Sequence, residues 1–184
     1  MTETDRERWH RWKESVFGSG YMIWHEGLDT RRVTRLRGRA RQDAQAMLAL
    51  GLQQGDPHAG QALAALGSPD AIPQIEAAME AVGPGIERMQ LALALHRLVP
   101  SDAHLEPVLA MLSAEASWSH RMDAAIALRL FPGERATEAA LRAMSADPHY
   151  HVRYHAADSA HALLGLGRPA ATDDPTLVPL LRDR

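Results

Sequence analysis

The sequence predicts an all-α fold, arranged as a right-handed α-solenoid of about four helix pairs behind an N-terminal helical cap. Ala and Leu, which favour helices, are abundant, whereas the β-branched and aromatic residues typical of strands are scarce. Short apolar segments of similar composition also recur about every 30 to 33 residues, separated by Gly, Pro and Asp. A period of this length built from helix pairs is typical of α-solenoids.

Length, charge and composition limit the possible functions. The 184 residues suffice for one domain or one continuous array, and the net charge is −3. Proteins that neutralise nucleic-acid phosphates normally carry a basic surplus, so nucleic acid is not the expected partner. The absence of cysteine excludes disulfides and thiolate metal sites. There is no long apolar run and the N-terminus is polar, so we expect a cytoplasmic protein without a membrane partner.

Residues 1–29 are expected to form a Trp-rich capping segment. A helix is predicted over residues 4–17, where four apolar residues share one face: Trp9, Trp12, Val16 and Phe17. The glycines at 18 and 20 end it, and the most aromatic stretch of the chain follows. Two interpretations stay open for this stretch. It covers the open end of a helical array, or Trp24, His25 and Glu26 belong to a binding site.

Residues 30–184 are expected to form the helical array. A long helix over 30–54 begins it, and its arginine-rich first half is interpreted as a solvated face or as a patch for a nucleic acid or an acidic partner. Shorter helices are predicted at 58–66, 70–82, 86–98, 103–116, 120–130, 136–145, 150–164 and 176–181. Each stop combines a helix breaker with a capping residue. Short connections make consecutive helices antiparallel neighbours.

The second helix of each pair shows the clearest self-similarity. When these helices are aligned, compact residues fall at matching positions: Ala62, Ala92, Ala125 and Ala157, and then Ala64, Ala94, Ala127 and Ser159. Small side chains at these positions allow a helix to pack close to its neighbours. The clearest copy spans residues 147–167, where Val152, Ala156, Ala160 and Leu163 form the predicted core stripe.

The repeated residues resemble the HEAT repeat, in the variety found in phycobilisome lyases. The resemblance covers residues 55–184 and rests on Asp147, Val152, Arg153, Ala156, Ala157, Ala160 and Leu163, with first-helix prolines at Pro73, Pro107 and Pro179. It implies that Asp147 and Arg153 bond between neighbouring repeats. We assign the same structural inter-repeat role to Arg88 and Arg121. Residues 1–54 resemble no family.

Histidines cluster in the last repeat. The chain has ten, and four of them are His149, His151, His155 and His161. His151 and His155 share a helix face and could chelate a metal, but Asp158 is the only carboxylate near them. HEAT-repeat di-iron hydroxylases carry His-Glu pairs at positions where this chain has none. We therefore predict no metal and no cofactor, and interpret the histidines as solvated or partner-contacting.

The predicted function is a non-catalytic protein-protein interaction module. The sequence contains no P-loop, no nucleophile elbow and no metalloprotease motif. Second helices of such arrays line the concave face, and their outward positions here mix aromatic, Met, Arg and acidic residues, a composition typical of protein-binding surfaces. The expected partner-binding residues are Trp118, Met122, Asp123, Arg129, Tyr150, Tyr154, His155, Asp158 and His161. The partner could be a bacterial toxin, bound by an immunity protein, or the client of an adaptor.

Four alternatives remain. HEAT-like DNA glycosylases use Trp, Asp and Arg in a basic groove, and Trp118, Arg121 and Asp123 supply these residue types, although the net charge argues against a DNA groove. Bilin lyases share the repeat type and act on a thiol of their client, so the missing cysteine does not exclude them. The chain could also self-associate through the C-terminal helix at 176–181. Finally, the outward residues could be ordinary surface without a partner.

Overall fold

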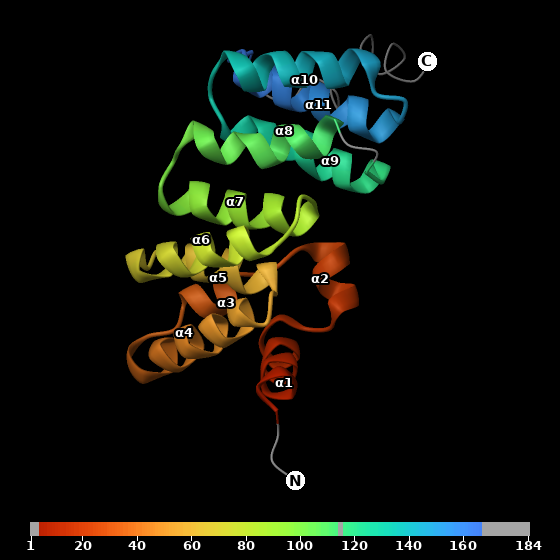
Figure 1. Cartoon of the computed structure of the whole chain (residues 1–184). Helices are drawn as coiled ribbons and strands as arrows, with labels where there is room; N and C mark the ends of the chain where they lie inside the picture. The colour runs from red at the N-terminus through yellow and green to blue at the C-terminus, as the bar shows by residue number, and fades with distance from the viewer. Residues whose placement is uncertain (1–3, 114–115, 167–184) are drawn as a thin grey trace. The chain divides into compact units, whose positions relative to one another are not determined.

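The structure is a computed structural model that describes residues 4–113 and 116–166. Every regular element in these residues is an α-helix or a short 3₁₀ helix, so the prediction of an all-α fold is confirmed. Figure 1 labels the α-helices along the chain. The chain divides into two compact units, Met1–Pro100 and Ser101–Arg184. No helix in the described ranges is long and apolar enough to cross a membrane.

The first unit contains seven of the labelled α-helices. In chain order they are α1 (Asp5–Phe17), α2 (Gly20–Glu26), α3 (Arg31–Thr34), α4 (Gly38–Gln53), α5 (Pro57–Leu66), then the 3₁₀ helix η1 (Pro69–Ala71), α6 (Ile72–Ala81) and α7 (Ile86–Leu98). The helix ends follow the expected capping chemistry. Asp56 accepts a hydrogen bond from the backbone of α5, Pro57 occupies its first turn, and Gly67 ends it in the left-handed conformation at φ +68°.

The prediction of a single helix over residues 30–54 is wrong, because the chain forms two helices there, α3 and α4, with a turn between them. Gly38 adopts a left-handed φ of +53° at the start of α4. The Arg37 guanidinium donates to the carbonyl oxygens of Thr34 and Leu36, at 2.8 and 2.9 Å. These bonds satisfy carbonyls at the end of α3 that have no helical partner. Part of the arginine block therefore ends a helix and does not extend a continuous basic face.

The N-terminal segment is an integral part of the first unit. α1 packs on α3 and α4, and two residues of its predicted apolar stripe, Trp9 and Phe17, are buried. Trp9 stacks on Trp12 with ring centroids 5.6 Å apart. α2 begins at the Ser19 cap and exposes Tyr21. The side chain of Trp24 lies outside the described part of the structure, so its proposed binding role stays a prediction.

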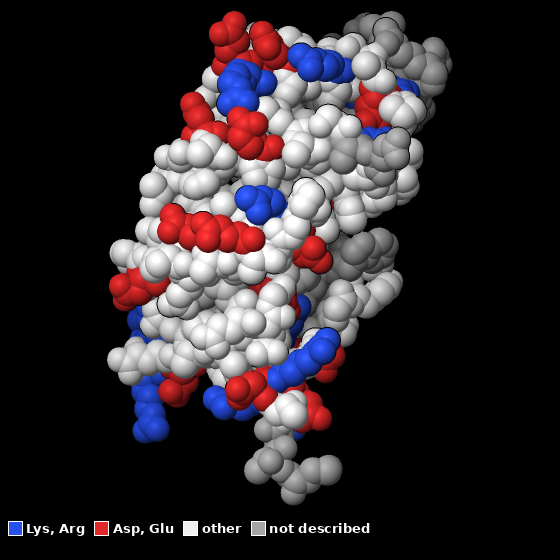
Figure 2. All heavy atoms as spheres, viewed as in Figure 1, with Lys and Arg blue, Asp and Glu red and all other residues white. Residues whose placement is uncertain are grey.

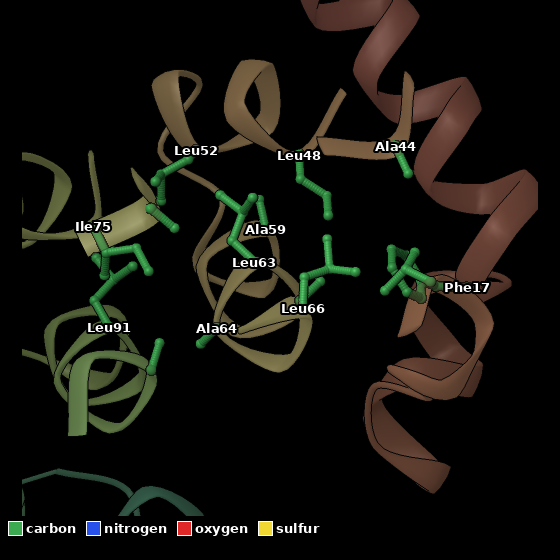
Figure 3. Packing of buried hydrophobic residues seen from close by; sticks show 14 of the residues in the cluster. Phe17, Ala44, Leu48, Leu52, Ala59, Leu63, Ala64, Leu66, Ile75 and Leu91 are labelled. Carbon is green, nitrogen blue, oxygen red and sulfur yellow. The ribbon is translucent and has the colours of Figure 1, made fainter. Parts of the chain in front are cut away.

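The core of the first unit is built around α5 (Figure 3). Leu66 faces Phe17 of α1 and Leu48 of α4, whereas Leu63 lies toward Leu52 and Leu91 on the other side of the helix. α5 can be surrounded in this way because most of its residues are small or aliphatic, and six of its ten are buried. Burial of this kind contributes about 25 cal/mol for each Å² of apolar surface, the main stabilising term of the fold.

Gly51→Ala is expected to destabilise the first unit by about 1–3 kcal/mol, because it overpacks the contact between α1 and α4. A Cβ at residue 51 would lie 2.5 Å from the Trp9 ring, which also stacks on Trp12 and cannot easily shift. Urea unfolding followed by tryptophan fluorescence measures the loss. Gly83→Ala is the control, because a Cβ there meets nothing within 4 Å. Equal stability of the two variants would contradict the predicted close contact.

The second unit contains four α-helices in its described residues. They are preceded by the 3₁₀ helix η2 (Asp102–Leu105) and are α8 (Glu106–Ser113), α9 (Trp118–Ala127), followed by the 3₁₀ helix η3 (Leu128–Leu130), α10 (Glu134–Ala146) and α11 (Tyr150–Leu163). α8 packs on α9, and α10 packs on α11, as expected for helix pairs. The helix predicted at 176–181, and the self-association assigned to it, lie outside the described residues.

α9 and α11 run parallel and in close contact. Rings at their first turns touch, and farther along, the Ser159 hydroxyl donates to the carbonyl oxygen of Ala125 at 2.6 Å. Ala125, Val152 and Ala156 form a buried cluster between the helices. This close approach is possible because the facing residues are small, as the aligned Ala and Ser positions predicted. Leu163, by contrast, is only half-buried.

Candidate functional site

Aromatic rings and histidines gather where α9 and α11 begin. Trp118, the first residue of α9, is 44% exposed and stacks on His149, with centroids 4.2 Å apart and planes 10° from parallel. The ring centroid of His151 lies 5.7 Å from that of Trp118, and the ring centroid of Tyr150 lies 5.3 Å from that of His151. The group continues along α11 through further ring contacts. We call it the aromatic–histidine surface and define it by Trp118, His149, Tyr150, His151, Tyr154 and His155.

An ion pair between Arg121 and Asp147 holds this surface together. Arg121 Nε donates to Asp147 Oδ2 at 2.8 Å and Nη2 donates to Oδ1 at 3.1 Å. Arg121 Nη1 also donates to the carbonyl oxygen of Ala116 at 2.6 Å. Asp147 Oδ1 accepts a further bond from the backbone N–H of His149, at 2.8 Å. The pair therefore fixes the turn before Trp118 and the turn before α11, which brings the Trp118 and His149 rings together.

The electrostatics favour the ionised form of this pair. Burial opposes ionisation of Asp147, but hydrogen bonds from Arg121 and from the His149 backbone outweigh it and hold the pKa of the carboxyl below its ordinary value. Hydrogen bonding with Asp147 in turn raises the pKa of Arg121. Both side chains are largely shielded from solvent, at 14% and 7% exposure. Such a bidentate pair is more rigid than an exposed salt bridge.

Arg88, Arg121 and Arg153, which were assigned to inter-repeat bonding, share a contact with backbone carbonyl groups. Each reaches back to backbone carbonyls in the segment before its own helix. Arg88 Nη1 lies 2.7 Å from the Met79 oxygen, and Arg153 Nη1 lies 2.8 Å from the Asp147 oxygen. Arg153 is 1% exposed, so its charge is stabilised by carbonyl groups in the interior. Arg121 also makes such a bond and, in addition, joins the pair α8–α9 to the turn before α11.

Of the residues predicted to face a partner, one is buried and a second is partly covered. Asp158 was expected to point outward but is 8% exposed, and Met122 packs partly against the buried cluster between α9 and α11. The physical reason is that α11 contacts both α9 and α10, so more of its circumference is covered than one apolar stripe. Asp123 and Arg129 are exposed, and His161 is half-buried.

The two tyrosines of α11 combine packing with partial exposure. Tyr150 and Tyr154 lie against Ala157, and their ring centroids are 6.0 Å apart. Tyr154 also meets the ring of His155 edge-on at 5.2 Å. Burial lowers the pKa of His155, although nearby Asp158 opposes this shift, so the ring is neutral near pH 7. The tyrosines are therefore held in place while part of each side chain stays accessible.

The histidines do not assemble as metal ligands in the described residues. No group of three His, Asp or Glu side chains there is placed to hold an ion. Nδ1 of His149, His155 and His161 is instead buried without a hydrogen-bond partner among the described atoms.

The first unit contains a polar network that the sequence did not indicate. Asp56 Oδ2 accepts bonds from Lys13 Nζ at 2.5 Å and from the Trp9 indole at 3.1 Å. His58 Nδ1 lies 3.1 Å from Lys13 Nζ and 3.1 Å from Asp56 Oδ1. The sequence did not indicate this cluster because Lys13 and Asp56 are more than forty residues apart in the chain. The one feature that could have pointed to it is that Lys13 is the only lysine in the sequence. Because Asp56 also caps α5, the network joins α1 to α5 and is structural.

An open groove of about 660 Å³ lies between α8 and α10. Its lining is mainly aliphatic, with Leu109 and Leu112 on one side and Ala139 and Ala143 on the other. Arg121 also lines it but is already bonded to Asp147. The groove therefore offers shape and apolar surface but no free buried charge.

In its described residues the protein is all-helical and carries an aromatic–histidine surface held by the Arg121–Asp147 pair. No family model, no curated protein and no solved structure matches the chain.

Proposed function

We propose that the protein is a non-catalytic protein-binding module, and that its partner docks on the aromatic–histidine surface. The observation that carries the proposal is the stack of Trp118 on His149, in which a large ring is exposed yet held in one orientation. Trp and Tyr are over-represented among residues that dominate binding energy. A ring that is already ordered also loses little conformational entropy when a partner covers it.

We further propose that the helix pairs continue as one right-handed α-solenoid of the HEAT type. Two features of the described residues support this. Each unit repeats the plan of an antiparallel helix pair, and arginines at equivalent places, Arg88, Arg121 and Arg153, each bond carbonyls that precede their own helix. In such an array α9 and α11 would be second helices on the concave face.

The partner is proposed to be a protein in the bacterial cytoplasm. A toxin held inactive by this chain, or a client held by it as an adaptor, would use the same surface. The DNA-glycosylase alternative is disfavoured because the Arg121 guanidinium is committed to Asp147 and Ala116. On the face drawn in Figure 2, acidic and basic side chains are interspersed with wide uncharged areas and form no basic tract.

Trp118→Ala is expected to weaken partner binding by about thirtyfold or more, the effect of losing one hot-spot residue. Folding stability should fall by only about 1 kcal/mol, since the lost stack is partly exposed. The measurement is quantitative affinity capture from the native host with mass spectrometry, followed by titration of the recovered partner. Leu141→Ala on α10, at similar exposure, is the control. Unchanged capture by Trp118→Ala would overturn the proposed surface.

A further inference from the structure

We propose that the aromatic–histidine surface recognises an acidic protein segment, one that presents Asp or Glu carboxylates to Trp118 and the neighbouring histidines. This inference rests on the proposed function and names the chemistry of the partner. It follows from three properties of the surface, namely its hydrogen-bond donors, the direction of its helices and the state of its neighbouring acids.

The surface presents donors more than acceptors. Within the described residues the Trp118 indole N–H makes no hydrogen bond, and the ring is exposed. Nδ1 of His149 and of His155 is enclosed, while both residues remain partly accessible. Because Nδ1 is enclosed, Nε2 is the ring nitrogen of each residue that can donate a proton to a partner. Indole and imidazole N–H groups pair well with carboxylate oxygens, because bonds to an ionised acceptor are the stronger ones.

The helices add a positive potential in the same place. Contacts between Trp118 and His149 and between Ala125 and Ser159 show that α9 and α11 are parallel, so their N-termini lie side by side. The N-terminus of a helix carries a partial positive charge that favours anions. Acidic residues commonly occupy such positions, but the first turns of α9 and α11 contain none.

The described acids near the surface do not compete for its donors. Asp147 is neutralised by Arg121, and Asp158 is buried beside His155. Asp123 is exposed but lies more than one turn after Trp118 on α9. Among the described residues, the surface therefore combines donors and positive helix ends without a carboxylate of its own to satisfy them, which is complementary to an acidic partner.

A nucleic acid would also supply anions, but it fits this surface less well. Phosphate backbones are bound mainly by permanent cations, which release condensed counterions. Here Arg121 and Arg153 are occupied by Asp147 and by backbone carbonyls, and His155 is neutral near pH 7. N–H donors with aromatic rings and no free guanidinium or ammonium match discrete carboxylates on a protein better than a continuous phosphate chain.

The test uses the full chain labelled with ¹⁵N and three probes: a short peptide of alternating Glu and Ser, matched peptides with Gln or Lys in place of Glu, and single-stranded oligothymidine. The indole N–H signal of Trp118 is assigned by its loss in Trp118→Phe. The Glu peptide is expected to shift this signal and leave that of buried Trp9 unchanged. His151→Glu, at an exposed position, should weaken the Glu peptide about tenfold or more through like-charge repulsion. His10→Glu on α1 is the matched control, because it makes the same change at an exposed histidine of the first unit.

The inference is overturned if the Glu peptide leaves the Trp118 signal unmoved at millimolar concentration, or if the Lys peptide or oligothymidine binds more tightly. Its failure can be told apart from failure of the proposed function. If capture of a host protein depends on Trp118 but the captured segment is neutral or basic, the proposed binding function is supported and the inference of an acidic partner is refuted. If capture is independent of Trp118, the binding function itself falls.

Discussion

Asp56→Ala is expected to destabilise the first unit by about 3–5 kcal/mol, the cost of breaking a largely buried ion pair from one side. The variant removes the cap of α5, the acceptor for the Trp9 indole and the counterion of Lys13. Both charged side chains are 15% exposed, so the ammonium left behind is poorly solvated. Urea unfolding is followed by fluorescence in a Trp118→Phe background, where the remaining tryptophans all report on the first unit.

A double-mutant cycle separates the unpaired charge from the lost cap. In a Lys13→Met background no ammonium remains, so Asp56→Ala should cost only the cap and the indole bond, about 1–2 kcal/mol. Asp70→Ala, at an exposed position of η1, is the control and should change stability by less than about 0.5 kcal/mol. An equal cost of Asp56→Ala with and without Lys13 would show that the ion pair contributes nothing.

The Asp56 carboxylate also makes the stability of the first unit depend on pH. Burial opposes ionisation of Asp56, but hydrogen bonds with His58 and Lys13 outweigh it, and its pKa in the folded state lies far below the ordinary value of 3.8. Its contribution is therefore present above about pH 4 and is lost as the pH falls below that value, because the unfolded chain then binds the proton first. In Asp56→Asn the free energy of unfolding should fall less steeply below about pH 4 than in the parent chain.

Asp147→Ala is expected to destabilise the second unit by about 3 kcal/mol and to disorder the aromatic–histidine surface. It leaves the shielded guanidinium of Arg121 without its counterion and removes the acceptor for the His149 backbone N–H. The turn before α11 should then lose its fixed position. Trp118 fluorescence during urea unfolding reports the stability, and the Trp118 indole N–H signal reports the order of the surface.

Two further variants make this prediction specific. Asp147→Asn keeps an acceptor for His149 but not the charge, so its cost should fall between those of the parent chain and Asp147→Ala. Glu138→Ala on α10 removes an exposed acid and should leave both readouts nearly unchanged. A Trp118 signal in Asp147→Ala identical to that of the parent chain would refute the positioning role of the ion pair.

Stability and binding are coupled through the Arg121–Asp147 pair in the second unit. Arg121 bonds the turn before α9, and Asp147 bonds the turn before α11. One ion pair therefore fixes the two segments that carry the stacked rings of Trp118 and His149. The first unit is held by a separate network around Asp56. Variants of Asp56 should therefore affect folding with little direct effect on the Trp118 ring, whereas variants of Asp147 affect both.

The sequence predicted the features that depend on local chemistry. Breakers and caps located most helices to within a few residues, and α7 was placed at its observed bounds. The aligned compact residues predicted the close packing of α9 and α11, and the histidines and aromatic residues near residue 150 pointed to the surface that the rings now form. The predicted helix over 30–54 failed because hydrophobic periodicity continued through a turn stabilised by side-chain bonds from Arg37.

The tertiary structure alone decided which polar residues face solvent and which are enclosed. Asp158 is buried, although its place on the helix indicated exposure, because α11 is covered from two directions by α9 and α10. The partners of Lys13 and Arg121 lie 43 and 26 residues away along the chain. Composition, caps and period act over a few residues, so the sequence by itself determined the helices and the compact positions between them. Burial and ion pairing depend on surfaces that meet only when those helices pack, and these contacts determined how the Trp118 ring is presented.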